Sequence, residues 1–251
     1  FKMVRIILRD DDLNSNCSDE DSEIFNSAAD VFDEVVLSIV PSPRENSLVG
    51  SQKKYFSELE QNPKFIKKIH TLLKKNNVSL SMHGLNHSGY GEFGKNIDIN
   101  KIMLTKRNME RVFKVNVNTF TPPNNILNKH NYLSLQKLGF TRIISAFSNW
   151  PFERPLNYCY LDHFLRSSIL AIRRKKDRRV LRRLNFNTIE EYPSFIAYTK
   201  ENLENIIDNI IISKPQKETT IVIATHYWEL WKSMPNKLLS LPDLIRCRLK
   251  H

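Results

Sequence analysis

Short apolar runs rich in β-branched residues alternate along the chain with segments whose apolar residues recur at helical spacing. This alternation predicts strands at 4–8, 35–40, 78–82, 117–121, 140–145, 185–192 and 219–224, and helices at 22–32, 63–76, 99–112, 132–138, 198–212 and 238–249. Strands that alternate with helices form a parallel sheet. Over 251 residues the favoured form is a closed or nearly closed β/α barrel.

Polar clusters follow four of the expected strands. In a parallel β/α barrel the functional residues lie at the carboxyl ends of the strands. The clusters are Asp10-Asp11-Asp12, His83-Gly84-Leu85-Asn86-His87, Thr121-Pro122-Pro123-Asn124-Asn125 and Thr225-His226-Tyr227-Trp228-Glu229. Each cluster alone has an ordinary structural explanation, such as a helix cap, a strand terminator or two histidines on one helix face. Four of them at one rim of a barrel predict a functional site.

The clusters contain the residue types that bind a catalytic metal ion. Histidines four residues apart, as at His83 and His87, can reach one ion from one turn of chain. With one carboxylate they make a three-ligand site with open positions, which is typical of catalytic zinc and also suits other divalent metals. A second carboxylate can take a proton from water, and a further histidine can protonate a leaving group. The set predicts hydrolysis of an acyl bond.

At these residues the sequence resembles the polysaccharide deacetylases, the NodB-homology family or carbohydrate esterase family four, in a divergent branch. The paired aspartates, the H-x-x-x-H motif and the late histidine of that family all have counterparts here. The resemblance implies that Asp12, His83 and His87 hold the metal. It also implies that Asp11 takes a proton from the attacking water and that His226 protonates the departing amine.

Several positions depart from the family's pattern. The acidic triplet can be read one residue earlier, which makes Asp10 the alternative base. Thr121 stands where the family has an arginine, and Arg9 is expected to supply that cation from another strand. Glu229 is an expected orienting carboxylate for the late histidine.

The segment after the fourth expected strand resembles the proline-containing groove motif of the family. Pro123, Asn124 and Asn125 are expected to bind substrate there, with the backbone N–H of Asn124 stabilising an oxyanion. Tyr227 and Trp228 are expected to form an apolar wall for a sugar ring or an acyl methyl group, with core packing as the alternative for each. The resemblance further implies a distorted (β/α) barrel of seven strands, with residues 1–251 forming one catalytic domain.

The charge of the chain bears on the expected partners. Lysines and arginines number 38 against 27 acidic residues, for a formal net charge of +11, and eight of the basic residues fall in Arg173–Arg183. Such a block can hold an anionic membrane surface or a lipid pyrophosphate, with a solvated helix face as the alternative. The apolar run at the N-terminus breaks at Arg9 and Asp10, too early for a signal peptide. We therefore expect a cytoplasmic protein, peripheral to the inner face of the membrane.

The expected activity is removal of an N-acetyl or N-formyl group from an amino sugar, in an intracellular or lipid-linked precursor of a surface glycan, with zinc as the metal. One alternative is a catalytically inactive barrel that binds a metal or a glycan. A nucleic-acid-binding protein is a weaker alternative, because the basic residues are not interleaved with aromatic stacking residues. The sequence has no apolar run of about 18 residues, so it predicts no membrane-spanning helix. Three scattered cysteines exclude a disulfide scaffold.

Overall fold

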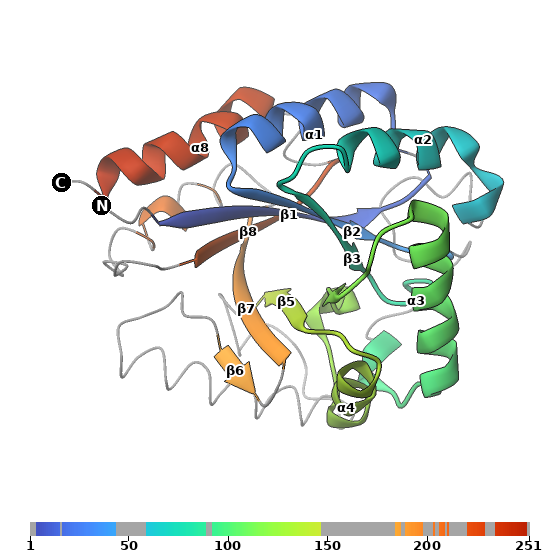
Figure 1. The fold of residues 1–251 in the computed structure, drawn as a ribbon. Coiled ribbons are helices and arrows are strands. Elements are labelled where there is room, and N and C mark those ends of the chain that lie inside the picture. The colour runs from blue at the N-terminus through green and yellow to red at the C-terminus, as the bar shows by residue number, and fades with distance from the viewer. Residues whose placement is uncertain are drawn as a thin grey trace.

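A computed structural model shows one sheet with helices packed around its outer side (Figure 1). The described residues are 4–15, 17–43, 59–88, 92–146, 184–186, 189–197, 203, 206–208, 210, 220–228 and 234–249. The strands are β1 (Arg5–Leu13), β2 (Glu34–Ile39), β3 (Val78–Met82), β4 (Thr119–Phe120), β5 (Arg142–Ala146), β6 (Leu184–Phe186), β7 (Ile189–Ile196) and β8 (Thr220–His226). The helices are α1 (Asp19–Val31), α2 (Pro63–Leu72), α3 (Ile99–Phe113), α4 (Lys129–Lys137) and α8 (Pro235–Arg248). Short 3₁₀ turns are η1 (Leu59–Gln61), η2 (Glu92–Gly94) and η3 (Pro123–Asn125).

The strands are ordered β5-β4-β3-β2-β1-β8-β7-β6, and β5 also pairs with β7. Every pairing around the ring from β1 through β5, β7 and β8 is parallel, so these strands close into a distorted barrel. The expected α/β barrel is therefore confirmed. The sheet has eight strands rather than the expected seven, because β6 adds antiparallel to β7.

The extra strand overturns the single strand expected at 185–192. That segment includes the reversal between β6 and β7, which pair from Leu184 opposite Glu191 to Phe186 opposite Ile189. Only Asn187 and Thr188 separate the paired residues Phe186 and Ile189, and neither is a glycine or a proline. The reversal therefore lacks the glycine or proline that would mark it most clearly in the sequence.

Strand β1 separates two apolar cores. An inner cluster takes one residue from each of five strands: Ile7, Val36, Ile144, Tyr192 and Val222. The neighbours Ile6 and Leu8 belong to the larger cluster that the helices share with the sheet. Because successive side chains of a strand point to opposite faces, Arg9 and Asp11 face the barrel interior with Ile7.

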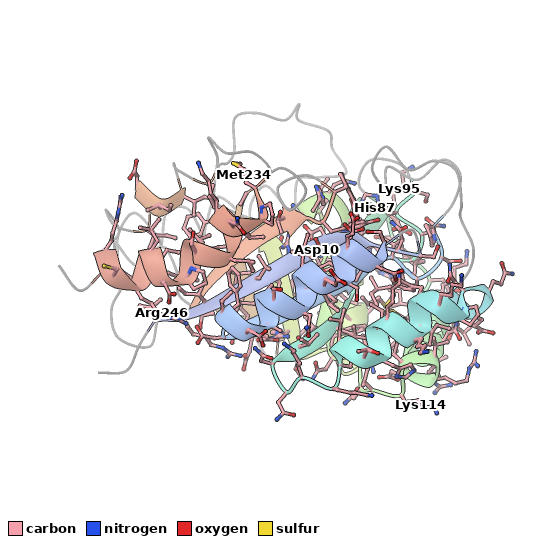
Figure 2. The ribbon with its side chains drawn as sticks, turned by 90° about the horizontal axis from the view of Figure 1, so that it is seen from above. Asp10, His87, Lys95, Lys114, Met234 and Arg246 are labelled. Carbon is pink, nitrogen blue, oxygen red and sulfur yellow. The ribbon has the colours of Figure 1, made fainter. Side chains whose placement is uncertain are left out.

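The helices begin where polar side chains cap them. Ser18 accepts a hydrogen bond from the backbone N–H of Asp21, whose carboxylate accepts from the Ser18 N–H, so α1 begins at Asp19 rather than at the expected residue 22. Asn62 accepts from the N–H of Phe65, which confirms the expected start of α2. Helices α8, α1 and α2 lie side by side over the sheet (Figure 2).

Several other boundaries differ from expectation, and helices α4 and α8 each begin three residues before the expected positions 132 and 238. Strand β1 continues to Leu13, because Asp10 and Asp11 remain paired with Thr225 and His226 of β8. Strand β4 is only two residues long, against the five expected at 117–121. Most of the helix expected at 198–212 and all of Arg173–Arg183 fall outside the described residues. Among the helices that are described, none has both the length and the apolarity needed to cross a membrane.

The amino end of the barrel holds an ion-pair network around the buried carboxylate of Glu34. Arg142 donates to both oxygens of Glu34, at 2.8 and 2.7 Å, and Arg5 donates to Oε2 at 2.8 Å. Ser79 donates to Oε1 at 2.6 Å, and the Arg142 Nε donates to Thr119 at 2.9 Å. Burial raises the pKa of Glu34, but Arg142, Ser79 and Arg5 together outweigh it, so the pKa is lowered overall.

Candidate active site

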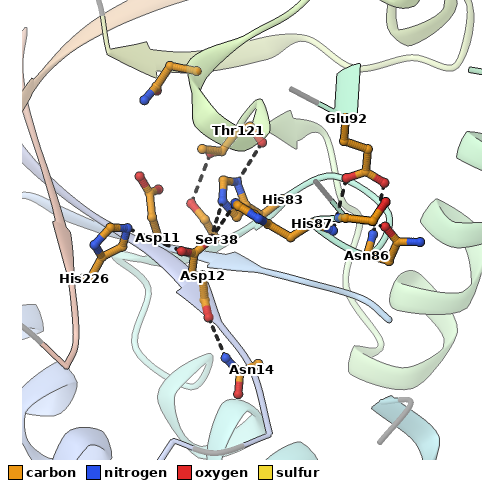
Figure 3. A network of polar contacts seen from close by, with 12 residues as sticks. Asp11, Asp12, Asn14, Ser38, His83, Asn86, His87, Glu92, Thr121 and His226 are labelled. Carbon is orange, nitrogen blue, oxygen red and sulfur yellow. Dashed lines mark hydrogen bonds and ion pairs between the residues drawn. The ribbon is translucent and has the colours of Figure 1, made fainter. Parts of the chain in front are cut away.

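The acidic triplet Asp10-Asp11-Asp12 lies inside the carboxyl-terminal part of β1 rather than after the strand. Asp12 should face outward with Asp10, but its φ of 61° is left-handed, and the pairing of β1 with β2 shifts register between Asp10 and Leu13. This bulge turns the Asp12 carboxylate toward the same space as that of Asp11 (Figure 3). Asn14 holds the turn by donating to the Asp12 carbonyl oxygen at 2.8 Å.

Asp10 lies apart from the other two aspartates. Its side chain is fully buried, and its charged neighbours include Asp21 of α1 on the outer side of the sheet. Burial, and then the charges of Asp11, Asp12 and Asp21, raise its pKa well above the usual value. Because side chains alternate along β1, Asp11 faces the barrel interior, where the bulge also directs Asp12, whereas Asp10 faces the outer side of the sheet.

Asp12, His83 and His87 form a compact cluster of metal-ligand types. Their ligand atoms all lie within 4.8 Å of one another, and all three residues are buried. The Nε2 atoms of His83 and His87 lie 2.8 and 3.1 Å from Asp12 Oδ1. Burial opposes the charge on Asp12, but its hydrogen bonds to both histidines hold its pKa far below the usual value. Burial likewise opposes protonation of His87, and contact with Asp12 raises its pKa overall.

The tautomer of His83 tests whether this cluster suits a metal ion. Its Nδ1 lies 2.9 Å from the carbonyl oxygen of Thr121, which only accepts, so Nδ1 carries the hydrogen in the neutral ring. The Nε2 lone pair then faces the Asp12 carboxylate at 2.8 Å, so two acceptors oppose each other. A proton or a cation must lie between such atoms. Because one oxygen and two nitrogens converge there, the donor set fits a divalent metal ion.

Arg9 and Asp11 form a second buried pair beside this cluster. The side chain of Arg9 is 0% exposed and donates to Asp11 Oδ2 at 2.5 Å. It also donates to the Ile144 carbonyl, to Ser194 Oγ and to Asn125 Oδ1, which places the guanidinium across the barrel interior. Asp11 Oδ1 is buried without a hydrogen-bond partner in the described part of the chain. The cation that pairs with Asp11 is thus Arg9 of β1, two residues before it in the sequence.

The late cluster places His226 on the other side of Asp12. The His226 Nε2 lies 3.4 Å from Asp12 Oδ2, and its ring stacks on Trp228 with centroids 4.6 Å apart and planes at 8°. Trp228 is half-buried there, whereas Tyr227 is 0% exposed and belongs to the outer core. The core-packing alternative therefore describes the position of Tyr227. Glu229 falls outside the described residues.

Some residues of the groove motif contact other parts of the protein. Pro123 packs on the histidine loop, because a Cβ added to Gly84 would lie 2.4 Å from Pro123 Cγ. Asn124 and Asn125 both have left-handed backbone angles, with φ of 53° and 55°. The Asn125 side chain orients Arg9, and Asn124 is half-buried. Thr121, in place of the arginine of the family, joins a buried hydroxyl cluster, with Ser81 Oγ at 2.8 Å and Ser38 Oγ at 3.1 Å.

One residue of the site was not among the expected ones. Glu92, on η2, accepts from the backbone N–H groups of Leu85, Asn86 and His87 (Figure 3). Burial raises the pKa of its carboxyl, against the effect of these N–H donors. No motif or spacing pointed to Glu92, which lies five residues after His87 in an unremarkable polar stretch.

The sequence matches no family model and no curated protein. A protein from Mycobacterium smegmatis that is assigned to the polysaccharide deacetylases superposes with a TM-score of 0.54 at 9% sequence identity. The match covers 99% of this chain and 85% of that protein. The chain shares its fold with the polysaccharide deacetylases. The expected resemblance is thus confirmed at the level of the fold.

The same barrel also occurs in other proteins. The 4-α-glucanotransferase from Thermococcus litoralis superposes with the same TM-score of 0.54 at 10% identity, over 100% of this chain and 38% of that protein. This chain thus spans well under half the length of that enzyme. A family 4 carbohydrate esterase from Streptomyces lividans superposes at a TM-score of 0.46 and 11% identity, over 99% and 88% of the two chains, too weakly to add to the argument. Because one fold serves different activities, the function has to be argued from the site.

Proposed function

We propose that the chain is a metal-dependent hydrolase that removes an N-acetyl or N-formyl group from an amino sugar. The observation that carries the proposal is the convergence of Asp12 Oδ1, His83 Nε2 and His87 Nε2 within 4.8 Å, next to the buried Asp11 carboxylate. In this proposal the three converging atoms hold a divalent metal, with zinc the best fit to two imidazoles and one carboxylate. Such a metal would polarise the amide carbonyl and increase the acidity of water.

Asp11 is the proposed base. Arg9 occupies its Oδ2, which leaves Oδ1 to accept a proton from the attacking water. Asp12 is less suited to that role, because His83 and His87 approach one of its oxygens and His226 the other. An oxygen that binds the proposed metal beside two histidine ligands is not available to take a proton from water.

His226 is the proposed acid, and it protonates the departing amine from the side opposite the two histidine ligands. Its stacking on Trp228 fixes the plane of the ring, so Nε2 stays directed toward the space beside Asp12. The backbone N–H of Asn124 is the proposed donor to the oxyanion, and the half-buried Trp228 is the proposed contact for the sugar or the acyl methyl group.

The substrate is proposed to be a glycan or a glycan precursor. The M. smegmatis protein that shares this fold is assigned to the polysaccharide deacetylases, and this assignment supports an N-acylated amino sugar. The eight basic residues in Arg173–Arg183 support a phosphate-bearing, lipid-linked form of it.

Acyl release from a panel of substrates tests the proposal. The zinc-loaded chain is incubated with N-acetylated and N-formylated amino sugars, free and linked to a lipid pyrophosphate, and acetate and formate are measured. The Asp11→Asn variant is the matched control for contaminating hydrolases. Metal binding without acyl release from any substrate would support the inactive binding barrel instead.

A further inference from the structure

The loop that carries both candidate histidine ligands is held by a carboxylate from outside the loop. The backbone N–H groups of Leu85, Asn86 and His87 donate to Glu92 at distances from 3.1 to 3.3 Å. Three consecutive N–H groups that converge on one acceptor form a nest, a concavity that binds anions. In this protein the anion in the nest is a side chain of the chain itself.

The loop needs such a partner because its backbone is strained. His87 has a left-handed φ of 52°, and Gly84 has a φ of 70°. A non-glycine residue in that region costs of order 1–3 kcal/mol and persists only where its surroundings hold it. A Cβ at Gly84 would lie 2.5 Å from Glu92 Oε2 and 2.4 Å from Pro123 Cγ, so the loop fits tightly between η2 and η3.

Glu92 is itself a fixed point. The next residue, Phe93, is fully buried and packs on Phe120 with ring centroids 4.7 Å apart. The Phe93 carbonyl oxygen accepts from Asn131 Nδ2 at 2.9 Å and from the Asn128 N–H at 3.0 Å, which ties η2 to the start of α4. The carboxylate is therefore anchored independently of the loop that it holds.

We propose that Glu92 is a positioning residue that sets metal affinity, by filling the nest of N–H groups and so holding His87 in its ligand geometry. The inference rests on the proposed function, because it takes Asp12, His83 and His87 as the metal ligands. Glu92 acts through the backbone of the loop and does not touch the metal. If its carboxylate is removed, the empty nest should accept a small carboxylate in its place.

Zinc affinity measures this role directly. The dissociation constant of zinc is determined by competition with a chromogenic chelator for the parent chain, Glu92→Gln, Glu92→Ala and the control Glu60→Gln. Outer residues that orient ligands typically contribute about 10–100-fold in metal affinity, and we expect a loss of that size in both Glu92 variants. Glu60, on η1, pairs with Arg111 at the surface, so its variant should bind zinc as the parent does.

Formate tests the nest itself. Added formate should restore zinc affinity in Glu92→Ala, where the three N–H groups are uncovered. It should not do so in Glu92→Gln, whose side chain still fills the nest, or in His87→Ala, which lacks the ligand. Formate added to the parent chain controls for its own binding to zinc.

An unchanged dissociation constant in both Glu92 variants, or a loss in Glu92→Ala that formate does not reverse, overturns the proposal. If Glu92→Ala does not fold, the dissociation constant of the isosteric Glu92→Gln decides. A parent chain that binds no zinc would contradict the proposed function itself. A parent that binds zinc and releases acyl groups, with Glu92 variants of equal affinity, would overturn the role of Glu92 alone.

Discussion

Each end of the barrel holds an arginine paired with a buried carboxylate, but the hydrogen bonding of the carboxylate is complete at only one end. At the amino end, Arg142 gives two parallel hydrogen bonds to Glu34, and Arg5 and Ser79 complete the coordination of both carboxylate oxygens. At the carboxyl end, Arg9 donates only one hydrogen bond to Asp11. Its other hydrogen bonds go to the Ile144 carbonyl, Ser194 Oγ and Asn125 Oδ1. At the amino end the protein itself supplies hydrogen-bond donors to both carboxylate oxygens. At the carboxyl end the acceptor atoms His83 Nε2 and Asp12 Oδ1 face one another.

The incomplete end is the one that needs a ligand. Among the described residues, Asp11 Oδ1 and His87 Nδ1 are buried without a hydrogen-bond partner, and His83 Nε2 faces a carboxylate oxygen. Buried polar atoms without partners cost free energy and are rare in folded proteins unless a water, ion or substrate completes them. The comparison therefore predicts that changes at the amino end affect stability and that changes at the carboxyl end affect metal binding and turnover.

The largest expected effect is at the proposed base. Asp11→Asn should reduce turnover by roughly 10²–10⁴-fold, the usual contribution of a general base. The amide oxygen of the variant can still accept from Arg9, so the fold and the bound zinc should be retained. Steady-state acyl release and zinc stoichiometry are measured together.

Asp10→Asn is the matched control for the register of the triplet. Its side chain lies on the outer face of β1, so turnover should fall much less than in Asp11→Asn. If Asp10→Asn abolishes turnover with zinc retained, and Asp11→Asn loses zinc, the base is Asp10 and the roles shift by one residue.

The next effect is at the amino end. Arg142→Met leaves the buried Glu34 carboxylate with only part of its coordination, and loss of one partner from a buried ion pair costs about 3–5 kcal/mol. The free energy of unfolding, from denaturant titration, should fall by that order. Zinc affinity measured well below the transition should be unchanged.

The exposed pair of Lys75 and Asp30 supplies the control for this prediction. Lys75→Met should cost less than about 1 kcal/mol, as is usual for surface ion pairs. Equal losses in Arg142→Met and Lys75→Met would show that the network at the amino end is not a special source of stability.

A smaller effect concerns zinc as a stabilising ligand. Free zinc at 100 times its dissociation constant should add about 2.7 kcal/mol to the free energy of unfolding of the parent chain. His83→Ala removes one of three ligands and should abolish this increment, while the metal-free stability changes less. His70→Ala, on α2 and remote from the cluster, is the control. Full zinc occupancy in His83→Ala would exclude His83 as a ligand.

Much of the candidate site follows from the sequence because one rule governs it. Parallel strands end at one rim, so His83, which directly follows β3, and His226, which ends β8, must lie near the residues that end β1. That rule places the aspartate triplet at the same rim as His83 and His87, and the family resemblance then indicates Asp12 as the ligand within the triplet. Strand 78–82 was also predicted with the bounds that β3 has, since its β-branched and apolar residues are closed on both sides by polar ones.

The parts that could not be predicted depend on contacts between distant segments. The bulge at Asp12 reverses the direction of one side chain, and nothing in three identical aspartates marks which one turns. In the sequence, Arg9 ends the apolar run of the first expected strand. In the structure it donates hydrogen bonds to β5 and β7 and lies buried inside the barrel. Glu92 is recognisable only when its three N–H donors are seen.

The smallest expected effect is a pH dependence at the amino end. The pKa of Glu34 is lowered in the folded protein, so the folded state binds its proton less readily than the unfolded state does. Stability from this group is fully present above the ordinary value of 4.5 and is lost as the pH falls through the lower folded pKa. Glu34→Gln should therefore show a shallower loss of unfolding free energy below pH 4.5 than the parent chain. The exposed Glu23→Gln on α1 should keep the slope of the parent, and a Glu34→Gln curve parallel to the parent would mean that the network at the amino end is not stabilised by the charge of Glu34.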